Sequence, residues 1–254
     1  MDEIVFGMYA VQAMLNNDPQ RFKEVWILQG RADHRLRTLV KLLEMHQVTI
    51  YTKTRSRMDQ QSEGGVHQGI IAVVQKKRPY QENDLLALLA KINNPFLLIL
   101  DGIMDPHNLG ACIRNADAAG VHAVIIPKDR SAQLTPIVRK VASGSAENVP
   151  LVHVTNLARV MRCLQRENIW IIGTTEKTHQ TLYQSNLTGP LSLVMGSEEK
   201  GMRRLTQENC NELVHIPMLG GVSSLNVSVA TGICLYEAVR QRNLCTKKQL
   251  DQLS

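Results

Sequence analysis

The chain has 254 residues, 44% of them hydrophobic, with a formal net charge of +6 and a pI near 9.1. That length supports one large domain or two smaller ones, and the basic balance favours a polyanionic partner, nucleic acid first. Five cysteines without a CxxC spacing argue against a disulfide framework and a zinc site. With no charged-then-apolar leader and no apolar run near the ~18 residues of a membrane span, we expect a soluble, cytoplasmic protein.

Residues 1–75 have the pattern of a small α/β unit. Apolar spacing predicts helices at 9–15 and 34–46, and short apolar runs predict strands at 25–28, 48–51 and 70–74. Seven Lys and Arg residues lie between Arg31 and Arg57. They fit either solvated helix and loop faces or a surface that docks an RNA backbone, and the sequence does not choose between the two. His67, in a turn-like stretch, is interpreted as structural.

The run QKKRPYQEND at 75–84 is charged, broken by proline and poor in apolar residues, as exposed linkers are. We therefore predict an N-terminal domain at 1–75, a linker at 76–84 and a second domain at 85–254. Beyond the linker, short apolar strands alternate with helices. Strands are expected at 96–101, 123–127, 150–154, 169–173, 191–196 and 213–217, and helices at 85–92, after Gly110, and near 134–143, 156–165 and 203–212.

This alternation predicts an α/β fold with a parallel sheet covered on both faces. Ligands of such sheets bind beyond the carboxyl ends of the strands, which directs attention to the loops after Asp101, Gly173, Gly196 and Met218. The spacing of Gly196 and Gly201 is that of a phosphate-binding loop. However, Met202 stands where its lysine is needed, which excludes an ATPase, and the chain has no GxGxxG.

Polar residues gather in the loops after Asp101 and Gly196. The stretch DPHNLGACIRNADAAG contains Asn108 and Arg114, and SEEKGM contains Glu198. Each has an ordinary interpretation: Asn108 as a cap, Arg114 as the partner of a carboxylate such as Asp117, and Glu198 as a helix start.

The last stretch, 216–242, opens on an apolar strand end and a Gly220-Gly221 break. Ser223, Ser224 and Asn226 are N-cap residue types before a helix expected from Val227. Small residues leave much of this helix smooth, and Gly232 inside it costs about 1 kcal/mol relative to Ala, so a close neighbour is expected there. By itself the stretch is typical of a strand, a turn and a core helix.

Taken in order, the three stretches resemble the motifs of the SpoU/TrmH family of RNA ribose methyltransferases, in the SPOUT superfamily. DPHNLGACIRNADAAG is similar to the first motif, LVMGSEEKGM to the second and IPMLGGVSSLNVSVATGICLYEAVR to the third. The resemblance covers about residues 96–242. The preceding unit is similar to the ribosomal-protein-like (L30e-like) RNA-binding domain of some members, and nearly the whole chain resembles those that methylate a guanosine ribose in the peptidyl-transferase loop of large-subunit (23S) rRNA.

The resemblance implies a fold and a cofactor that the pattern alone does not. It implies a parallel α/β domain whose C-terminal segment forms a deep trefoil knot, and a homodimer with the active site at the interface. It also implies S-adenosylmethionine, held largely by backbone groups at Gly196, Ile216 and Leu225, with no metal.

The reaction implied is methyl transfer to a ribose 2′-hydroxyl. The family assigns Arg114 to the reacting hydroxyl and its phosphate, and Asn108, Glu198, Ser224 and Asn226 match positions that hold or orient the site. Because a guanidinium is effectively always protonated, stabilisation of a developing alkoxide is the better physical role for Arg114 than proton abstraction. His107 is interpreted as structural. Glu199 departs from the glycine that often follows the second-motif glutamate, which would strain the loop if that position needs positive φ.

Three alternatives remain. A tRNA guanosine ribose methyltransferase would carry similar motifs. A non-catalytic RNA-binding or ribosome-assembly protein would share the charge and the N-terminal unit. A C5-pyrimidine methyltransferase needs a nucleophilic cysteine beside a base, and Cys112 and Cys234 lie inside helical motifs.

Overall fold

The computed structural model describes residues 2–31 and 33–251, with side chains up to Cys245. The chain divides into two compact units. Unit 1 comprises the chain up to Arg78 together with Gln133–Asn148, and unit 2 comprises Pro79–Ala132 and the chain from Val149 onward. The backbone therefore passes between the units three times. The predicted single boundary differs from this, because the predicted helix near 134–143 is grouped with unit 1.

Unit 1 is built on a mixed four-stranded sheet in the order β1-β4-β2-β3. Its strands are β1 (Asp2–Phe6), β2 (Phe22–Leu28), β3 (Thr49–Lys53) and β4 (Ile70–Gln75). β4 pairs antiparallel with β1 and β2, while β2 and β3 are parallel. β1 and helix α3 (Arg55–Gln61) are absent from the sequence prediction, because neither has a long periodic apolar pattern.

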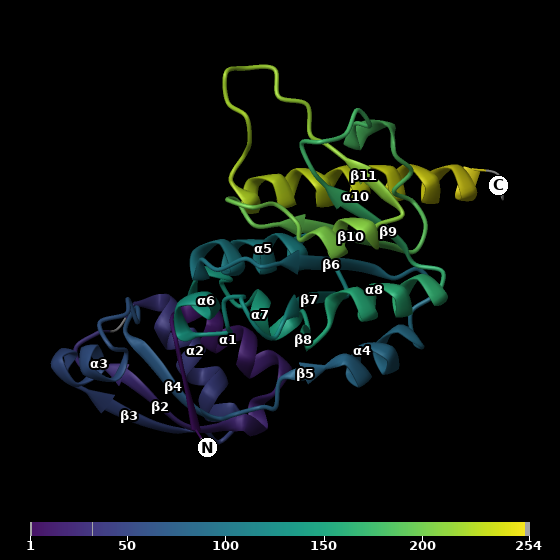
Figure 1. The fold of residues 1–254 in the computed structure, drawn as a ribbon. Helices are drawn as coiled ribbons and strands as arrows, with labels where there is room; N and C mark the ends of the chain where they lie inside the picture. Colours follow the sequence, from purple (N-terminus) through teal and green to yellow (C-terminus); the bar gives the residue numbers. More distant parts are fainter. Residues whose placement is uncertain (1, 32, 252–254) are drawn as a thin grey trace. The chain divides into compact units, whose positions relative to one another are not determined.

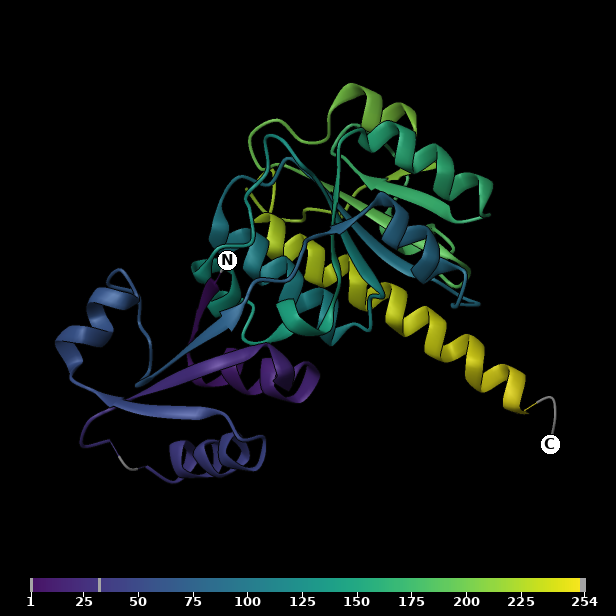
Figure 2. The same ribbon diagram turned by 90° about the horizontal axis from the view of Figure 1, so that it is seen from below.

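The two faces of this sheet are covered by different helices. Helices α1 (Met8–Asn17) and α2 (His34–Met45) pack their apolar sides on the face that carries Val5, Val25 and Ala72. The opposite face carries Phe6, Trp26 and Ile71 and is packed by Met58 of α3. Figure 2 shows α2 and α3 on opposite sides of the strands. The short helix η1 (Pro19–Arg21) precedes β2.

The segment Gln133–Asn148 adds helices α6 (Pro136–Val141) and α7 (Ser145–Asn148) to unit 1. Gly144 brings it against α1: a Cβ added there would lie 2.7 Å from the Cβ of Ala13 and 3.0 Å from the carbonyl oxygen of Tyr9. Such spacing leaves room only for glycine, whose φ here is +97°.

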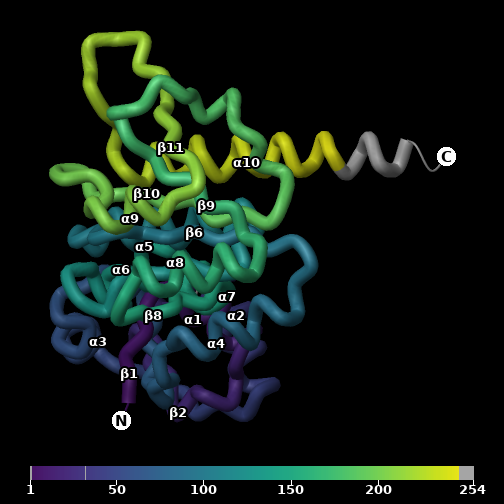
Figure 3. Tube along the Cα trace, turned by 45° about the vertical axis from the view of Figure 1, so that its right-hand side comes forward, coloured from purple at the N-terminus to yellow at the C-terminus, as the bar shows by residue number. Residues whose placement is uncertain are grey.

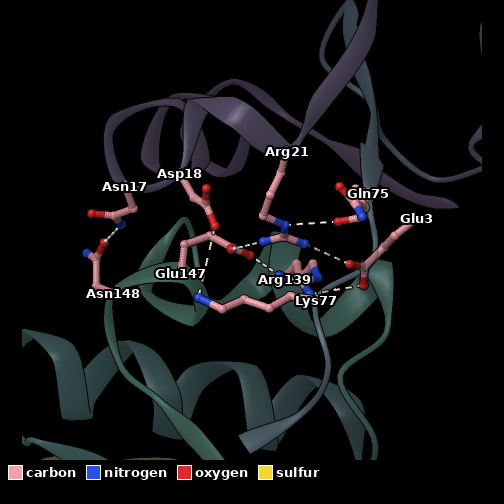
Figure 4. A network of polar contacts seen from close by, with 9 residues as sticks. All are labelled: Glu3, Asn17, Asp18, Arg21, Gln75, Lys77, Arg139, Glu147 and Asn148. Carbon is pink, nitrogen blue, oxygen red and sulfur yellow. Dashed lines mark hydrogen bonds and ion pairs between the residues drawn. The ribbon is translucent and has the colours of Figure 1, made fainter. Parts of the chain in front are cut away.

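Four nearly buried charged side chains hold this segment in unit 1 (Figure 4). Arg21 is 3.3 Å from Glu3 and 3.4 Å from Glu147, and Arg139 is 2.9 Å from Glu3 and also pairs with Glu147. Burial lowers the pKa of the Arg139 guanidinium, an effect that Glu3 opposes. Two positive and two negative charges therefore neutralise each other in a site that water hardly reaches.

Unit 2 contains a seven-stranded sheet in the order β11-β9-β10-β6-β7-β8-β5, in which every pairing is parallel (Figure 1). Its strands are β5 (Tyr80–Gln81), β6 (Phe96–Asp101), β7 (Ala123–Pro127), β8 (Leu151–Val154), β9 (Trp170–Thr174), β10 (Leu191–Gly196) and β11 (Glu212–Val214). The predicted parallel α/β sheet is confirmed. β11 ends three residues before the predicted strand end at 217.

Helices cover both faces of this sheet. Helices α4 (Glu82–Leu89) and α8 (Leu157–Arg166) share a core with alternate strand residues such as Leu97 and Ile99. Helices α5 (Pro106–Ala118) and α10 (Val227–Asp251) contact each other, and α10 also contacts β10. Successive strand residues point to opposite faces, so Leu98 and Leu100 face away from the α4 and α8 core. The remaining helices are α9 (Arg204–Glu208) and η2 (Leu182–Gln184).

The linker predicted at 76–84 is shorter in the structure. Tyr80 and Gln81 form β5, which pairs with β8, and α4 begins at Glu82 with a capping box between Gln81 and Asp84. Some polar residues of this stretch, Gln81 and Asp84, cap a helix, and amino-acid composition alone does not distinguish cap residues from linker residues.

The loop between β11 and α10 extends away from the sheet (Figures 1 and 3). Within the described residues, no helix is long and apolar enough to cross a membrane. Nor do the described side chains include a group of three His, Cys, Asp or Glu residues placed to hold a metal ion.

Candidate active site

Helix α5 begins at the carboxyl end of β6. Pro106 occupies the first helical turn, and the carboxylate of Asp105 caps the helix by accepting hydrogen bonds from the backbone N–H groups of His107 and Asn108 (3.1 and 3.2 Å). Helix α5 therefore starts four residues before Gly110, earlier than predicted. Because Asp105 is the cap, the side chain of Asn108 is available for another role.

The loop after β10 folds back on itself. Ser197 and Gly201 exchange backbone hydrogen bonds of 3.1 and 2.8 Å. A Cβ at Gly196 would lie 2.2 Å from the carbonyl carbon of Gly201, so residue 196 must be glycine for the turn to close. Gly201 takes the positive φ of this loop, +63°, and Glu199 is not among the residues with positive φ. The strain considered for Glu199 is therefore absent.

The turn presents Glu198 to the starts of two helices. The Oε1 atom of Glu198 accepts hydrogen bonds from Asn108 Nδ2 (3.1 Å), Asn226 Nδ2 (2.6 Å) and the backbone N–H of Val227 (3.2 Å). Asn226 Nδ2 also donates to Asn108 Oδ1 at 3.0 Å. One residue from each of the three motifs thus meets in a single cluster, and the carboxylate lies at a helix N-terminus, where negative charge is favoured.

Asn226 also caps α10, as its residue type predicts. Its Oδ1 accepts from the backbone N–H and the hydroxyl of Ser228, at 2.9 and 2.6 Å. Seven residues after Asn108, on the same stripe of α5, Asn115 Nδ2 donates to the Ser228 carbonyl at 2.8 Å. A Cβ at Gly232 would be 3.4 Å from this Asn115 amide, so Gly232 provides the close approach expected of it.

The structure leaves three of the polar candidate side chains exposed and unpaired. Arg114 is exposed on α5 and makes no hydrogen bond or ion pair with the described residues, so the ordinary interpretation as a partner of Asp117 does not hold. Ser224, in the loop before α10, and the imidazole of His107 are likewise exposed and without a side-chain partner among those residues. These groups are available to a ligand.

The predicted cofactor residues lie at the same edge of the sheet. Gly196 ends β10, and Ile216 and Leu225 are half-buried at the two ends of the loop before α10. The backbone groups of residues 216–225 form no hydrogen bond with the described part of the chain. This free backbone beside half-buried aliphatic side chains suits a ligand with an aromatic base and an amino-acid tail.

One buried residue at this edge was not a candidate. Asp101, 1% exposed at the end of β6, accepts from the Arg203 backbone N–H at 2.8 Å, and its Oδ1 lies 3.4 Å from Arg203 Nε. Arg203 directly follows the Glu198 turn, so the pair anchors one end of that turn to the sheet. A carboxylate closing the otherwise apolar run FLLILD is the sequence signal that could have identified it.

Three of the cysteines of unit 2 are poor nucleophiles. Burial raises the pKa of the Cys112 thiol to about 11 and those of Cys210 and Cys234 to about 12. Cys112 lies in α5 and Cys234 in α10, as predicted, while Cys210 follows α9 rather than lying in a helix. None of these three has the thiolate character of a nucleophile.

Comparison with known proteins defines the class to which this fold and site belong. The profile of the SpoU rRNA Methylase family matches residues 95–236, and that of the RNA 2'-O ribose methyltransferase substrate binding family matches residues 4–80. The first match contains the first two motifs, all but the last four residues of the third, and more than half of the chain. The chain belongs to the SpoU rRNA Methylase family.

Whole-chain relatives are more specific. A protein of Yersinia pestis named 23S rRNA (guanosine-2'-O-)-methyltransferase RlmB is 63% identical over 96% of this chain and 99% of its own. The RlmB of Escherichia coli K12 is also 63% identical, over 96% of this chain and 100% of its own. The crystal structure of the SpoU methyltransferase AviRb from Streptomyces viridochromogenes, in complex with the cofactor AdoMet, superimposes with a TM-score of 0.78 and 24% identity over 95% and 90% of the two chains. This last likeness is one of fold.

Proposed function

We propose that this chain transfers a methyl group from S-adenosylmethionine to the ribose 2′-hydroxyl of a guanosine in 23S rRNA. The observation that carries the proposal is the convergence of Asn108, Glu198 and Asn226 from three separate motifs, with an unpaired Arg114 on the same helix as Asn108. The choice of substrate is supported by the names of relatives 63% identical over almost the whole chain.

The cofactor is proposed to lie against the loop between β11 and α10. Its support is the unpaired backbone of residues 216–225, between the half-buried Ile216 and Leu225, which offers donors and acceptors without a competing partner. Backbone groups at Gly196 are proposed to complete the cradle. When bound, S-adenosylmethionine supplies an electrophilic methyl group, so this chain has only to align the hydroxyl and stabilise its charge.

Arg114 is proposed to bind the reacting ribose and its phosphate. Its exposed guanidinium can donate to the oxygen that gains negative charge as its proton leaves, and it stays protonated while doing so. Asn108, Glu198 and Asn226 are proposed to orient the site by fixing the starts of α5 and α10, and Ser224 to contact the bound ligands.

Unit 1 is proposed to bind the RNA, on the support of its match to a substrate-binding family and its basic composition. We further propose an L30e-like origin for unit 1, a trefoil knot in unit 2, a homodimer with the site at its interface, and action in the cytoplasm. The knot is proposed on the resemblance of the three motifs to those of the SpoU/TrmH family. Within unit 2, Gln241 of α10 bonds both the Leu187 N–H (3.0 Å) and the Ser185 carbonyl (3.1 Å), which ties this helix to the segment after β9.

The test uses 23S rRNA from cells that lack this protein. Purified protein and labelled S-adenosylmethionine should place one methyl group on a guanosine ribose, detected as a bond that resists alkaline hydrolysis. If the label appeared in tRNA and not in 23S rRNA, the chain would instead be a tRNA guanosine ribose methyltransferase. Cofactor binding without methylation of either RNA would favour an assembly protein with a vestigial site.

A chelator tests the proposed independence from metal. Turnover should survive EDTA once the RNA has been folded. Loss of cofactor binding in EDTA, restored by a divalent ion, would contradict it.

A further inference from the structure

Unit 1 contains a cleft that is lined by none of the residues discussed for catalysis. It has a volume of about 580 Å³ and is lined by residues 28–31, by Arg55 and Asp59 of α3, and by residues 64–69. Its three walls are therefore the loop after β2, helix α3 and the loop before β4. A cleft of this volume is within the range of small-ligand sites, roughly 300–1,000 Å³.

Internal hydrogen bonds hold the walls in place. His67 Nε2 lies 3.0 Å from Asp59 Oδ1, and His67 Nδ1 accepts from the Gly69 N–H at 3.0 Å. Arg31 links the loop after β2 to the loop before β4 by donating to the Gln68 carbonyl, and it also donates to Asp33, both at 2.5 Å. The structural interpretation of His67 is consistent with these contacts. Because the walls are tied to one another, a ligand would meet a preformed surface and cost little ordering entropy.

The chemistry of the cleft is amphiphilic. Arg55 is exposed and makes no hydrogen bond or ion pair with the described residues, whereas the one carboxylate in the lining, Asp59, is engaged with His67. Val66, which follows Gly64 and Gly65, is 61% exposed and offers an aliphatic contact surface. The backbone N–H groups of Gly30 and Val66 also lack a partner among the described residues. The cleft thus combines a free cation, an apolar contact and free backbone donors.

Two further cations, Lys53 and Arg57, are two residues away from Arg55 in the chain. Lys53 and Arg57 lie 5.2 and 6.0 Å from the ring of Trp26, and neither pairs with a carboxylate in the described part of the chain. The phosphates of an RNA strand could contact these cations while one nucleotide of the strand entered the cleft. Proteins recognise RNA sequence mainly through bases that have left the stack, which need both a flat apolar contact and hydrogen bonds to their edges.

We propose that this cleft receives a single unstacked nucleotide of the RNA substrate, with Arg55 on its phosphate and the base against Val66 and the Gly30 and Val66 N–H groups. The inference rests on the proposed function, because it takes the ligand to be RNA. It assigns unit 1 a role in choosing the RNA sequence beyond supplying charge.

The experiment compares three variants of the full chain, Arg55→Ala, Val66→Asp and Lys76→Ala. Lys76 is an exposed cation at the other end of the six-residue strand β4, about 20 Å from the cleft at the usual strand rise. For each we would measure the binding of a 23S rRNA fragment over a range of salt concentrations, and KM and kcat for its methylation. Thermal unfolding would confirm that these exposed substitutions leave the fold intact.

Arg55→Ala and Val66→Asp should each weaken RNA binding and raise KM by about tenfold or more, with kcat nearly unchanged. Arg55→Ala should also lower the slope of log K against log salt by about one, whereas Lys76→Ala should leave KM within about twofold of the wild type. Equal effects of Arg55→Ala and Lys76→Ala, or no effect of Val66→Asp, would overturn the cleft and leave only diffuse attraction.

The two proposals fail in different ways. If the wild type methylates 23S rRNA while the cleft variants match it in KM, the nucleotide site is wrong and the function stands. If the variants lose RNA binding but the wild type transfers no methyl group, the cleft stands as an RNA site and the proposed reaction is wrong.

Discussion

The two units use polar side chains in opposite ways. In unit 1, Arg21 and Arg139 are 8% and 7% exposed and share two carboxylates, so each charge has opposite charges as neighbours. In unit 2, the Glu198 cluster is exposed, and Arg114, on the same helix as Asn108, has no partner in the described chain. A satisfied buried network stabilises one arrangement, whereas an exposed, partly satisfied one keeps capacity to bind.

The comparison also shows that residues that are neighbours in the sequence can belong to different structural units. The methylase profile runs through residues 133–148, yet the structure groups them with unit 1. Glu3 and Arg139 are 136 positions apart and lie 2.9 Å from each other. The unit that is proposed to bind RNA is therefore completed by a segment inside the catalytic sequence.

The largest effect is expected from deleting residues 1–75. This removes the partners of Val138, Arg139 and Glu147 and leaves an apolar and charged surface uncovered, so most of the truncated protein should be insoluble or partly unfolded. A second variant that also replaces residues 133–148 by a flexible linker should be soluble and bind S-adenosylmethionine, as measured by calorimetry. A fully folded, cofactor-binding protein after the first deletion alone would show that the segment does not depend on unit 1.

Arg139→Ala breaks the network of unit 1 from within. Removing one partner of a buried ion pair costs about 3–5 kcal/mol, because the remaining carboxylates lose their neutralising charge. The chain has two tryptophans, so in a Trp170→Phe background the fluorescence of Trp26 reports the unfolding of unit 1 in urea. Lys23→Ala, which breaks the exposed pair with Asp2 in the same unit, is the control and should change stability by less than about 1 kcal/mol. Similar losses in both would contradict a special role for burial.

Arg114→Ala should have the converse effect, a slower reaction in an equally stable protein. A positioned transition-state donor is worth about 10²–10³ in rate, while cofactor affinity should hardly change. Single-turnover methylation with saturating RNA measures this. Arg114→Lys keeps the charge without the planar fork, so near-normal turnover would reduce Arg114 to a phosphate contact. Normal turnover by Arg114→Ala would contradict the structural interpretation of His107 and make this exposed imidazole the candidate base.

Glu198→Gln tests the orienting cluster with a smaller change. The amide retains the shape but not the charge that accepts three N–H donors, so we expect a decrease in turnover of about tenfold. The melting temperature should stay within about 2 °C, because the side chain is exposed. Glu199→Gln, one residue further along the turn, should be silent. A rate equal to that of the wild type in the Glu198 variant would mean that the cluster only caps α10.

The smallest effect is expected from thiol modification. Since burial raises the pKa of Cys112 to about 11 and of Cys234 to about 12, these thiols stay protonated at pH 8 and become reactive only as the pH rises toward those values. Iodoacetamide at pH 8 should leave turnover unchanged, with both residues unmodified by mass spectrometry. Inactivation that tracks alkylation of either one would revive the C5-pyrimidine alternative.

By itself, the sequence predicted six of the seven strands of the unit 2 sheet, and it selected the candidate residues of the site. Strands 96–101, 123–127 and 191–196 match their predicted bounds, because a strand buried on both faces of a parallel sheet is a continuous apolar run between polar ends. Asn108, Glu198 and Asn226 could be selected because they follow such runs and match a known set of motifs.

Only the tertiary structure decided which of these residues touch and which unit the middle segment completes. An apolar or charged residue shows in the sequence that it needs a partner, but not which one, since ion pairs and close packing act through space at any separation along the chain. From the sequence alone, residues 133–148 therefore look like one more helix of the catalytic domain. In the structure, Glu3 is the ion-pair partner of Arg139, and Arg21 is the ion-pair partner of Glu147. The cleft between Arg55 and Val66 is of the same kind, because two loops and helix α3, which are separate in the sequence, acquire a common surface when the strands of unit 1 pair.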